Sequence, residues 1–390
     1  MNPQALMAEE DALLVPTYGK FPLVLARGEG ARVYDQGGRR YLDFYGGHAV
    51  AALGHSPKAV VEALSAQAGE LLFYSTLAYH PARGRAARAL LGLLGVEDGK
   101  VFFCNSGAEA NEAAMRAARL ATGRRTVVSV AGGFHGRTMG ALAATGIAKY
   151  KKVEAGLGTD CVTVPLGDLE AAAAALKGAA ALITEPVQSM AGAPPPPAGW
   201  LEGLTALCRR EGALLIFDEV QTGLGRLGAP SAAQAFGVTP DVQTFAKAIA
   251  SGVPCGAAVF SAPVAAALKP GNLGSTFGGG PLACAAAAAT LEEITRRRLW
   301  ENASAMEKLI RRTFTFPGVK AVQGRGLLLG LVLDRPAKAV QTALFEKGVL
   351  AGTSEDPAVL RLLPPLTIGE AEVAELRAAL ADVLAAEAVA

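Results

Sequence analysis

The middle of the chain alternates short apolar, β-branched runs with longer segments that suit helices. The runs cover residues 126–130, 161–165, 179–184, 213–218, 241–245 and 256–260. Their spacing leaves room for crossover helices, the connections that parallel strands need. The pattern predicts an α/β fold whose central sheet is mostly parallel and covered on both faces.

We expect two domains, because the patterns at the two ends of the chain differ from the middle. A large domain would span residues 50–285. Near the N-terminus, glycine turns in the runs at 23–35 and 40–44 favour an antiparallel meander. Near the C-terminus, residues 290–312 suit one helix and residues 326–333 suit a strand. Residues 1–49 and 286–390 would together build a smaller α+β domain.

Composition points to a small-molecule partner. Charged residues make up 18% of the 390 residues and the net charge is +2, so no strong field favours nucleic acid or a membrane surface. The five cysteines form no Cys-x-x-Cys pair, and the N-terminus lacks the basic-then-apolar layout of a signal peptide. We therefore expect a cytoplasmic protein, and no cluster of ligand residues predicts a metal.

Two residues in the second half of the chain suit a pyridine cofactor bound through an amine. Asp218 ends an apolar run, and a carboxylate at the carboxyl edge of a sheet can keep a pyridine nitrogen protonated. Lys247 lies among apolar neighbours, which lower the pKa of an amine and let it attack an aldehyde. Taken singly, Asp218 could cap a helix and Lys247 could extend to solvent. Together they indicate pyridoxal phosphate.

A turn of small residues at 105–108 opens an alanine-rich helix. The free amides and positive dipole at such a helix start can hold a phosphate. The alternative is an ordinary cap by Asn105 or Ser106 that Glu109 completes, and for the turn alone this is the commoner case.

The segment 132–138 follows another strand. Phe134 could stack on a flat ring, and Arg137 could bind a substrate carboxylate through two hydrogen bonds. A solvated loop arginine beside a core phenylalanine is the alternative. His135 has no neighbouring ligand residues, so we interpret it as a packing or hydrogen-bonding residue.

Residues 223–228 match the Gly-x-Gly-x-x-Gly fingerprint of dinucleotide-binding proteins. The match has the wrong context, since residues 219–222 separate it from the strand and Asp241 opens a strand instead of ending one. A nicotinamide-dependent dehydrogenase is therefore a remote alternative.

Five segments in this order resemble the class III (subgroup II) pyridoxal-phosphate aminotransferases: residues 103–112, 134–138, 218–223, 246–248 and 274–279. The likeness runs from Tyr18 to residue 366. It implies the fold type I of pyridoxal-phosphate transferases and a homodimer with active sites at the subunit interface.

The resemblance also implies a role for each matching residue. In the cofactor site, Lys247 would bind the aldehyde and later move a proton, and Asp218 would pair with the ring nitrogen. The backbone amides of Gly107 and Ala108 would bind the phosphate of the cofactor, and Phe134 and Val220 would pack on the two faces of its ring. Gln221 would bond near its phenolic oxygen, and Thr276 would reach the phosphate of the cofactor in the neighbouring subunit.

On the substrate side, the resemblance implies that Arg137 and Arg361 bind carboxylates, that Ser275 lies beside the substrate, and that Tyr18 lines the entrance. The implied reaction moves the terminal amine of N-acetylornithine to 2-oxoglutarate. Acetyl-lysine, succinylornithine, ornithine and 4-aminobutyrate remain open as donors, and a binding protein without turnover is a further alternative. One departure is Met190, where relatives carry a glutamate that can cover the arginine matching Arg361.

Overall fold

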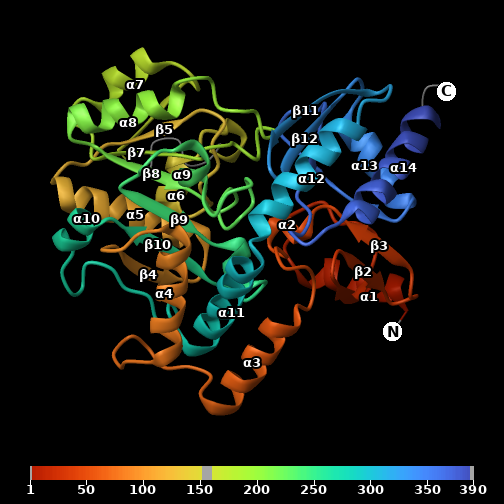
Figure 1. The fold of residues 1–390 in the computed structure, drawn as a ribbon, viewed down its shortest axis with the longest axis horizontal. Helices are drawn as coiled ribbons and strands as arrows, with labels where there is room; N and C mark the ends of the chain where they lie inside the picture. Colours follow the sequence, from red (N-terminus) through yellow and green to blue (C-terminus); the bar gives the residue numbers. More distant parts are fainter. Residues whose placement is uncertain (1, 152–159, 387–390) are drawn as a thin grey trace.

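A seven-stranded sheet forms the centre of the protein, whose computed structural model describes residues 2–151 and 160–386 (Figure 1). The strand order is β4-β10-β9-β8-β7-β5-β6. Pairings from β6 through β9 are parallel, and β10 runs against both of its neighbours. The strands are β4 (Lys100–Cys104), β5 (Val127–Val130), β6 (Cys161–Val164), β7 (Ala181–Thr184), β8 (Leu214–Asp218), β9 (Val242–Phe245) and β10 (Gly256–Phe260). The predicted α/β fold is confirmed.

Helices cover both faces of this sheet, which explains why its strands are apolar throughout. Leu182 and Leu215 belong to one buried cluster, whereas Ile183 and Ile216 belong to another on the opposite face. The first face packs on α7 (Leu169–Leu176) and α8 (Trp200–Glu211); the second packs on α5 (Gly107–Thr122), α6 (Met139–Ala144) and α10 (Ala262–Ala267).

Two smaller sheets come from the ends of the chain, and both termini lie on the same side of the molecule in Figure 1. The predicted antiparallel meander is present as β1 (Leu25–Glu29), β2 (Arg32–Asp35) and β3 (Arg40–Asp43), and β13 (Val349–Leu350) joins β3 in parallel. The other sheet contains β11 (Val319–Arg325), β12 (Leu328–Leu333), β15 (Val359–Leu362) and β14 (Gly352–Thr353).

The prediction of a single helix over residues 290–312 is wrong. The chain forms α11 (Pro281–Arg297) and α12 (Leu299–Thr313), which are separated by Arg298 in a left-handed conformation with φ 46°. The break lets α11 pack on α3 (Lys58–Glu70) and α4 (Pro81–Leu94), while α12 packs on β11 and on α14 (Glu370–Ala386). The expected domain boundary at residue 285 falls inside α11, so the division into domains stays a prediction.

The remaining elements are short or lie near the ends of the chain. They are α1 (Pro3–Leu13), α2 (Gly46–Ala49), α9 (Ala232–Phe236), α13 (Ala337–Glu346) and the 3-10 turns η1 (Ala148–Tyr150) and η2 (Lys247–Ala250). Within residues 2–151 and 160–386, no helix is both long enough and apolar enough to span a bilayer. The same residues contain no cluster of three or more side chains suited to a metal ion.

Candidate active site

A cavity of about 340 Å³ lies where the carboxyl ends of β4, β8 and β9 meet. Open α/β sheets bind ligands at this edge. Residues that the sequence predicted for a cofactor line the cavity together: Gly107, Ala108, Phe134, Asp218, Val220 and Lys247.

Asp218 is buried at the end of β8, and hydrogen bonds fix its carboxylate. Its Oδ2 accepts from Asn111 Nδ2 at 2.7 Å and lies 2.8 Å from His135 Nδ1, while its Oδ1 accepts from Val220 N at 3.0 Å. Thr244 Oγ1 donates to Asn111 Oδ1 at 2.6 Å, which sets the orientation of that amide. The carboxylate is therefore held in one orientation at the cavity.

Sequence reasoning missed Asn111 as a functional residue and gave His135 only a general hydrogen-bonding role. Asn111 lies one helical turn after Gly107 in α5, so it shares a face with the residue that opens the cavity. That spacing was a usable signal. The contact between His135 and Asp218 joins residues 83 positions apart, which no local pattern reveals.

Lys247 begins the 3-10 turn η2 after β9, with its backbone in the left-handed region at φ 43°. Burial lowers the pKa of its amine, although the negative charges of Asp218 and Glu185 act in the opposite direction. A lowered pKa increases the fraction of neutral amine, which is the nucleophilic form.

Glu185 is a buried carboxylate that the sequence did not single out. It accepts from Phe134 N at 2.8 Å and from Ser189 N at 3.4 Å. Burial, together with the charge of Asp218, raises the pKa of Glu185 to about 7. Its side chain therefore joins the backbone at Phe134 to the backbone at Ser189.

The turn before α5 is both a helix cap and part of the cavity wall. Ser106 Oγ accepts from Glu109 N at 3.2 Å, and Glu109 Oε2 accepts from Asn105 N at 2.9 Å. The capping interpretation is thus correct, yet the first helical amides still lack intrahelical partners where they line the cavity. A Cβ at Gly107 would lie 2.8 Å from Val220 Cγ1, so the close approach requires glycine.

Arg361 lies on β15, where only 3% of the residue is exposed. Its Nε donates to Thr353 O at 2.7 Å, its Nη1 to Ser189 Oγ at 3.1 Å and its Nη2 to the Tyr45 hydroxyl at 3.5 Å. Burial lowers its pKa, and its positive charge in turn lowers the pKa of Lys247. Among the described residues, no carboxylate forms an ion pair with Arg361.

Arg137 and Tyr18 are both exposed and lie near each other, outside the residues that line the cavity. The Arg137 guanidinium carbon is 5.9 Å from the Tyr18 ring centroid and 4.7 Å from that of Tyr150. Gln221 Nε2 donates to His48 O at 3.4 Å, while its buried Oε1 has no partner within the described residues.

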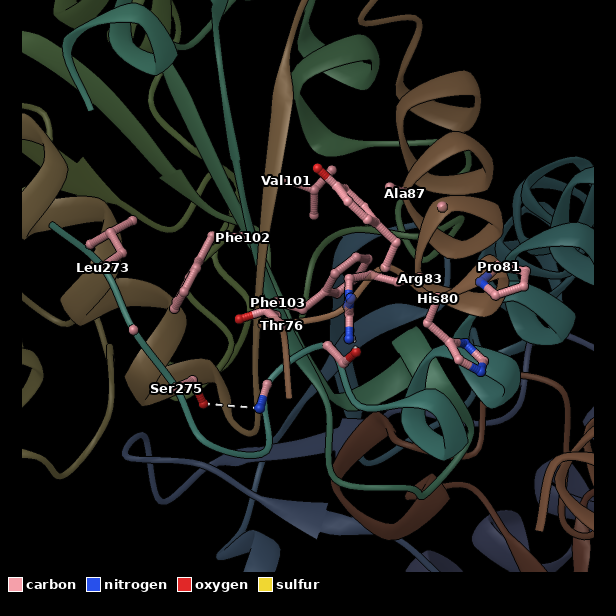
Figure 2. Close-up of a pocket in the computed structure, with 15 residues that line it drawn as sticks. Thr76, His80, Pro81, Arg83, Ala87, Val101, Phe102, Phe103, Leu273 and Ser275 are labelled. Atoms are coloured by element: carbon pink, nitrogen blue, oxygen red, sulfur yellow. Dashed lines mark hydrogen bonds between the residues drawn. The ribbon is translucent and has the colours of Figure 1, made fainter. Parts of the chain in front are cut away.

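Ser275 and Thr276 are not among the residues that line this cavity, although Ser275 contacts Asn105, which does. Ser275 Oγ accepts from Asn105 Nδ2 at 3.2 Å and from Gly278 N at 3.0 Å, and it lines a second, larger cavity of about 740 Å³ (Figure 2). Thr276 is exposed. The structure therefore brings six of the predicted cofactor residues into one cavity, with Ser275 behind Asn105 in its wall and Thr276 outside its lining.

The glycine fingerprint at 223–228 forms a turn instead of opening a long helix. The next helix, α9, begins only at Ala232 and has five residues. This is not the geometry that a dinucleotide needs.

The fold and the cavity are those of an α/β enzyme with its chemistry at the carboxyl edge of the sheet. The family model "Aminotransferase class-III" matches residues 14–384, and the chain belongs to the class III aminotransferases, which depend on pyridoxal phosphate. The family expected from the sequence is confirmed.

Individual relatives agree with this assignment. An acetylornithine aminotransferase from Streptomyces coelicolor is 45% identical, covering 98% of this chain and 96% of its own length. The crystal structure of an ornithine aminotransferase from Toxoplasma gondii superposes with a TM-score of 0.94 at 30% identity, covering 100% of this chain and 97% of that one. A second structure of the T. gondii enzyme, with a TM-score of 0.92 at 30% identity over 99% of this chain and 94% of that one, has partial occupancy of PLP at its active site.

Proposed function

We propose that the protein transfers the terminal amine of N-acetylornithine to 2-oxoglutarate, giving N-acetylglutamate semialdehyde and glutamate. The observation that carries the chemistry is the presence of Lys247 and Asp218 in one cavity at the start of α5. The donor is supported by the 45% identity to a relative named acetylornithine aminotransferase.

The residues around the cavity fit pyridoxal phosphate. The amides of Gly107 and Ala108 suit its phosphate, because the N-terminus of a long helix favours an anion. Phe134 and Val220 offer apolar surfaces for its ring, and Asp218 offers an acceptor for the ring nitrogen. By the resemblance Gln221 would lie near the phenolic oxygen, and its Oε1 is buried without a partner among the described residues. When bound, the cofactor supplies an aldehyde that joins amines and a ring that withdraws electrons from the carbon bearing the amine.

Lys247 has two tasks in this proposal. Its neutral amine, favoured by the lowered pKa, forms the covalent link to the aldehyde. Lys247 Nζ would also be the base that takes the proton from the carbon bearing the substrate amine. Asp218, held by Asn111 and His135, would hold a negative charge for the ring nitrogen of the cofactor.

Two arginines would bind the carboxylates of the two substrates. Arg137 lies exposed beside Tyr18, which suits the carboxylate of an extended acylated donor. Arg361 is buried without a described carboxylate partner, so a carboxylate of 2-oxoglutarate would supply its missing counter-charge.

We also propose a homodimer whose second copy covers the surface around Ser275. Large apolar side chains are exposed there, among them Leu77 at 92% and Phe277 at 63%. They directly neighbour Thr76 and Gly278, which line the cavity of about 740 Å³, and exposed apolar patches of this kind mark interaction sites. Thr276, next to Phe277, would then reach the partner's cofactor site. All five cysteines are free thiols, which supports a cytoplasmic location.

The dimer has its own test. Leu77→Asp should give monomers in sedimentation experiments and little activity, because the charge is placed in the covered surface. Leu25→Asp, at a site 57% exposed on β1, is the matched control and should stay dimeric and active. A Leu77→Asp protein that sediments as the wild type would reject this interface.

The donor is tested by comparing kcat/KM for N-acetylornithine, acetyl-lysine, succinylornithine, ornithine and 4-aminobutyrate at fixed 2-oxoglutarate. N-acetylornithine should be used best. Faster turnover of ornithine or 4-aminobutyrate would overturn the donor assignment. Failure of every amine to change the cofactor's visible spectrum would indicate a binding protein, and tight NAD binding without a cofactor band would indicate a dehydrogenase.

A further inference from the structure

The glycine-rich turn at 223–228 follows the strand that ends in Asp218 after a gap of four residues. Gly223 N donates to Glu219 O at 3.0 Å, and Arg226 N donates to Gly223 O at 3.2 Å. The turn is therefore fixed by its own backbone to the end of β8. This gives Arg226 a defined position relative to Asp218.

The Arg226 side chain crosses from this turn to the sheet that holds Arg361. Arg226 is 3% exposed, and its Nη1 donates to Leu327 O at 3.1 Å and to Pro364 O at 2.5 Å. Leu327 directly precedes β12, and Pro364 follows β15 by two residues. These strands are antiparallel partners in which Gly330 lies opposite Arg361, so both carbonyls lie at one end of the pair.

The two backbones also meet directly. Leu327 N donates to Arg226 O at 2.8 Å, and a Cβ at Gly326 would collide with that same oxygen. The Arg226 Nη2 atom is buried without a partner within the described residues. The two bonds of Nη1 thus connect the turn at 223–228 to both strand ends.

We propose that Arg226 is a positioning residue that sets the location of Arg361 relative to Asp218. The proposal rests on the proposed function, in which Arg361 binds 2-oxoglutarate and Arg137 binds the amino donor. Arg226 holds the sheet that carries Arg361, whereas Arg137 belongs to the loop after β5. Loss of Arg226 should therefore weaken the binding of one substrate and spare the other.

The test measures KM for both substrates in the holoenzyme. Arg226→Met should raise KM for 2-oxoglutarate about tenfold, because two hydrogen bonds from a charged donor are lost, and leave KM for N-acetylornithine unchanged. Arg226→Lys keeps a cation but loses the fixed geometry of the guanidinium, so we expect a rise of about threefold. Ser304→Ala is the control: it removes the hydroxyl that donates to Gly228 O in the same turn, and it should change neither KM.

Equal rises in both KM values, or an unchanged KM for 2-oxoglutarate, would overturn the proposal. Should Arg226→Met fail to fold, Arg226→Lys decides by the same criterion. A wild-type protein that does not use 2-oxoglutarate would reject the proposed function instead. In that case a crystal structure of the variant still decides, because the proposal requires β12 and β15 to shift relative to β8 and fails if the structures superpose.

Discussion

His135 Nδ1 lies 2.8 Å from Asp218 Oδ2, with both side chains almost completely buried. The same oxygen accepts from Asn111 on α5. Two side chains from different elements thus hold the carboxylate that we assign to the ring nitrogen of the cofactor. These contacts fix its position, as electrostatic stabilisation of a reacting group requires.

Replacing Asp218 should reduce turnover far more than cofactor binding. Asp218→Ala removes the charge that lets the ring withdraw electrons, so kcat should fall about 10²- to 10³-fold. Titration with pyridoxal phosphate, read by absorbance, should show a smaller loss of affinity. Asp241→Asn is the control, because this carboxylate accepts from Leu215 N outside the cavity. Unchanged turnover in Asp218→Ala would contradict the role.

His135 should act through Asp218. His135→Ala removes a partner of the carboxylate, and kcat should fall about tenfold, as for other residues that orient a functional group. His135→Asn keeps a donor near the position of Nδ1 and should recover most of the activity. Steady-state measurements of kcat for His135→Ala and His135→Asn check this. Equal losses in the two variants would instead indicate a packing role.

Capture of pyridoxal phosphate by the apoenzyme should depend on pH through Lys247. The amine is neutral above its pKa, so the rate should rise with pH through that lowered pKa and then level off. Glu185 raises the pKa of Lys247, so Glu185→Gln should move the midpoint to lower pH. Glu219 is also a buried carboxylate, but it accepts from the first amides of α9, so Glu219→Gln should leave the midpoint unchanged. Stopped-flow absorbance gives the midpoints, and an upward shift in Glu185→Gln would reject the assignment.

A carboxylate at position 190 should screen Arg361. Ser189, the preceding residue, already accepts from Arg361 Nη1. Met190→Glu would place a negative charge beside this guanidinium, so glutamate should compete about tenfold more weakly at the donor step. Met190→Gln has a similar length without the charge and should behave as the wild type. Unaltered inhibition by glutamate in Met190→Glu would show that position 190 does not screen Arg361.

The sequence predicted the central strands well because their signals are local. The apolar run before Asp218 became β8 with nearly the expected limits, and the turn at Ser106 capped α5 as its spacing indicated. The Asn111 and His135 contacts with Asp218 required the sheet to bring distant segments together.

Other features depended on packing that no sequence pattern contains. The left-handed Arg298 divides a segment whose periodicity suits one helix, because α11 and α12 pack on different partners. Arg226 appeared only as part of a glycine motif, and its acceptors Leu327 and Pro364 are more than a hundred residues away. The contact between Ser275 and Asn105 in the cavity wall likewise joins residues 170 positions apart.

The covalent link at Lys247 is tested most directly by reducing the holoenzyme with borohydride and mapping the modified peptide by mass spectrometry. The account predicts that the pyridoxyl group is found on Lys247, and that Lys247→Ala carries none. A pyridoxyl group on another lysine, or an unmodified Lys247 in reduced, active enzyme, would contradict it.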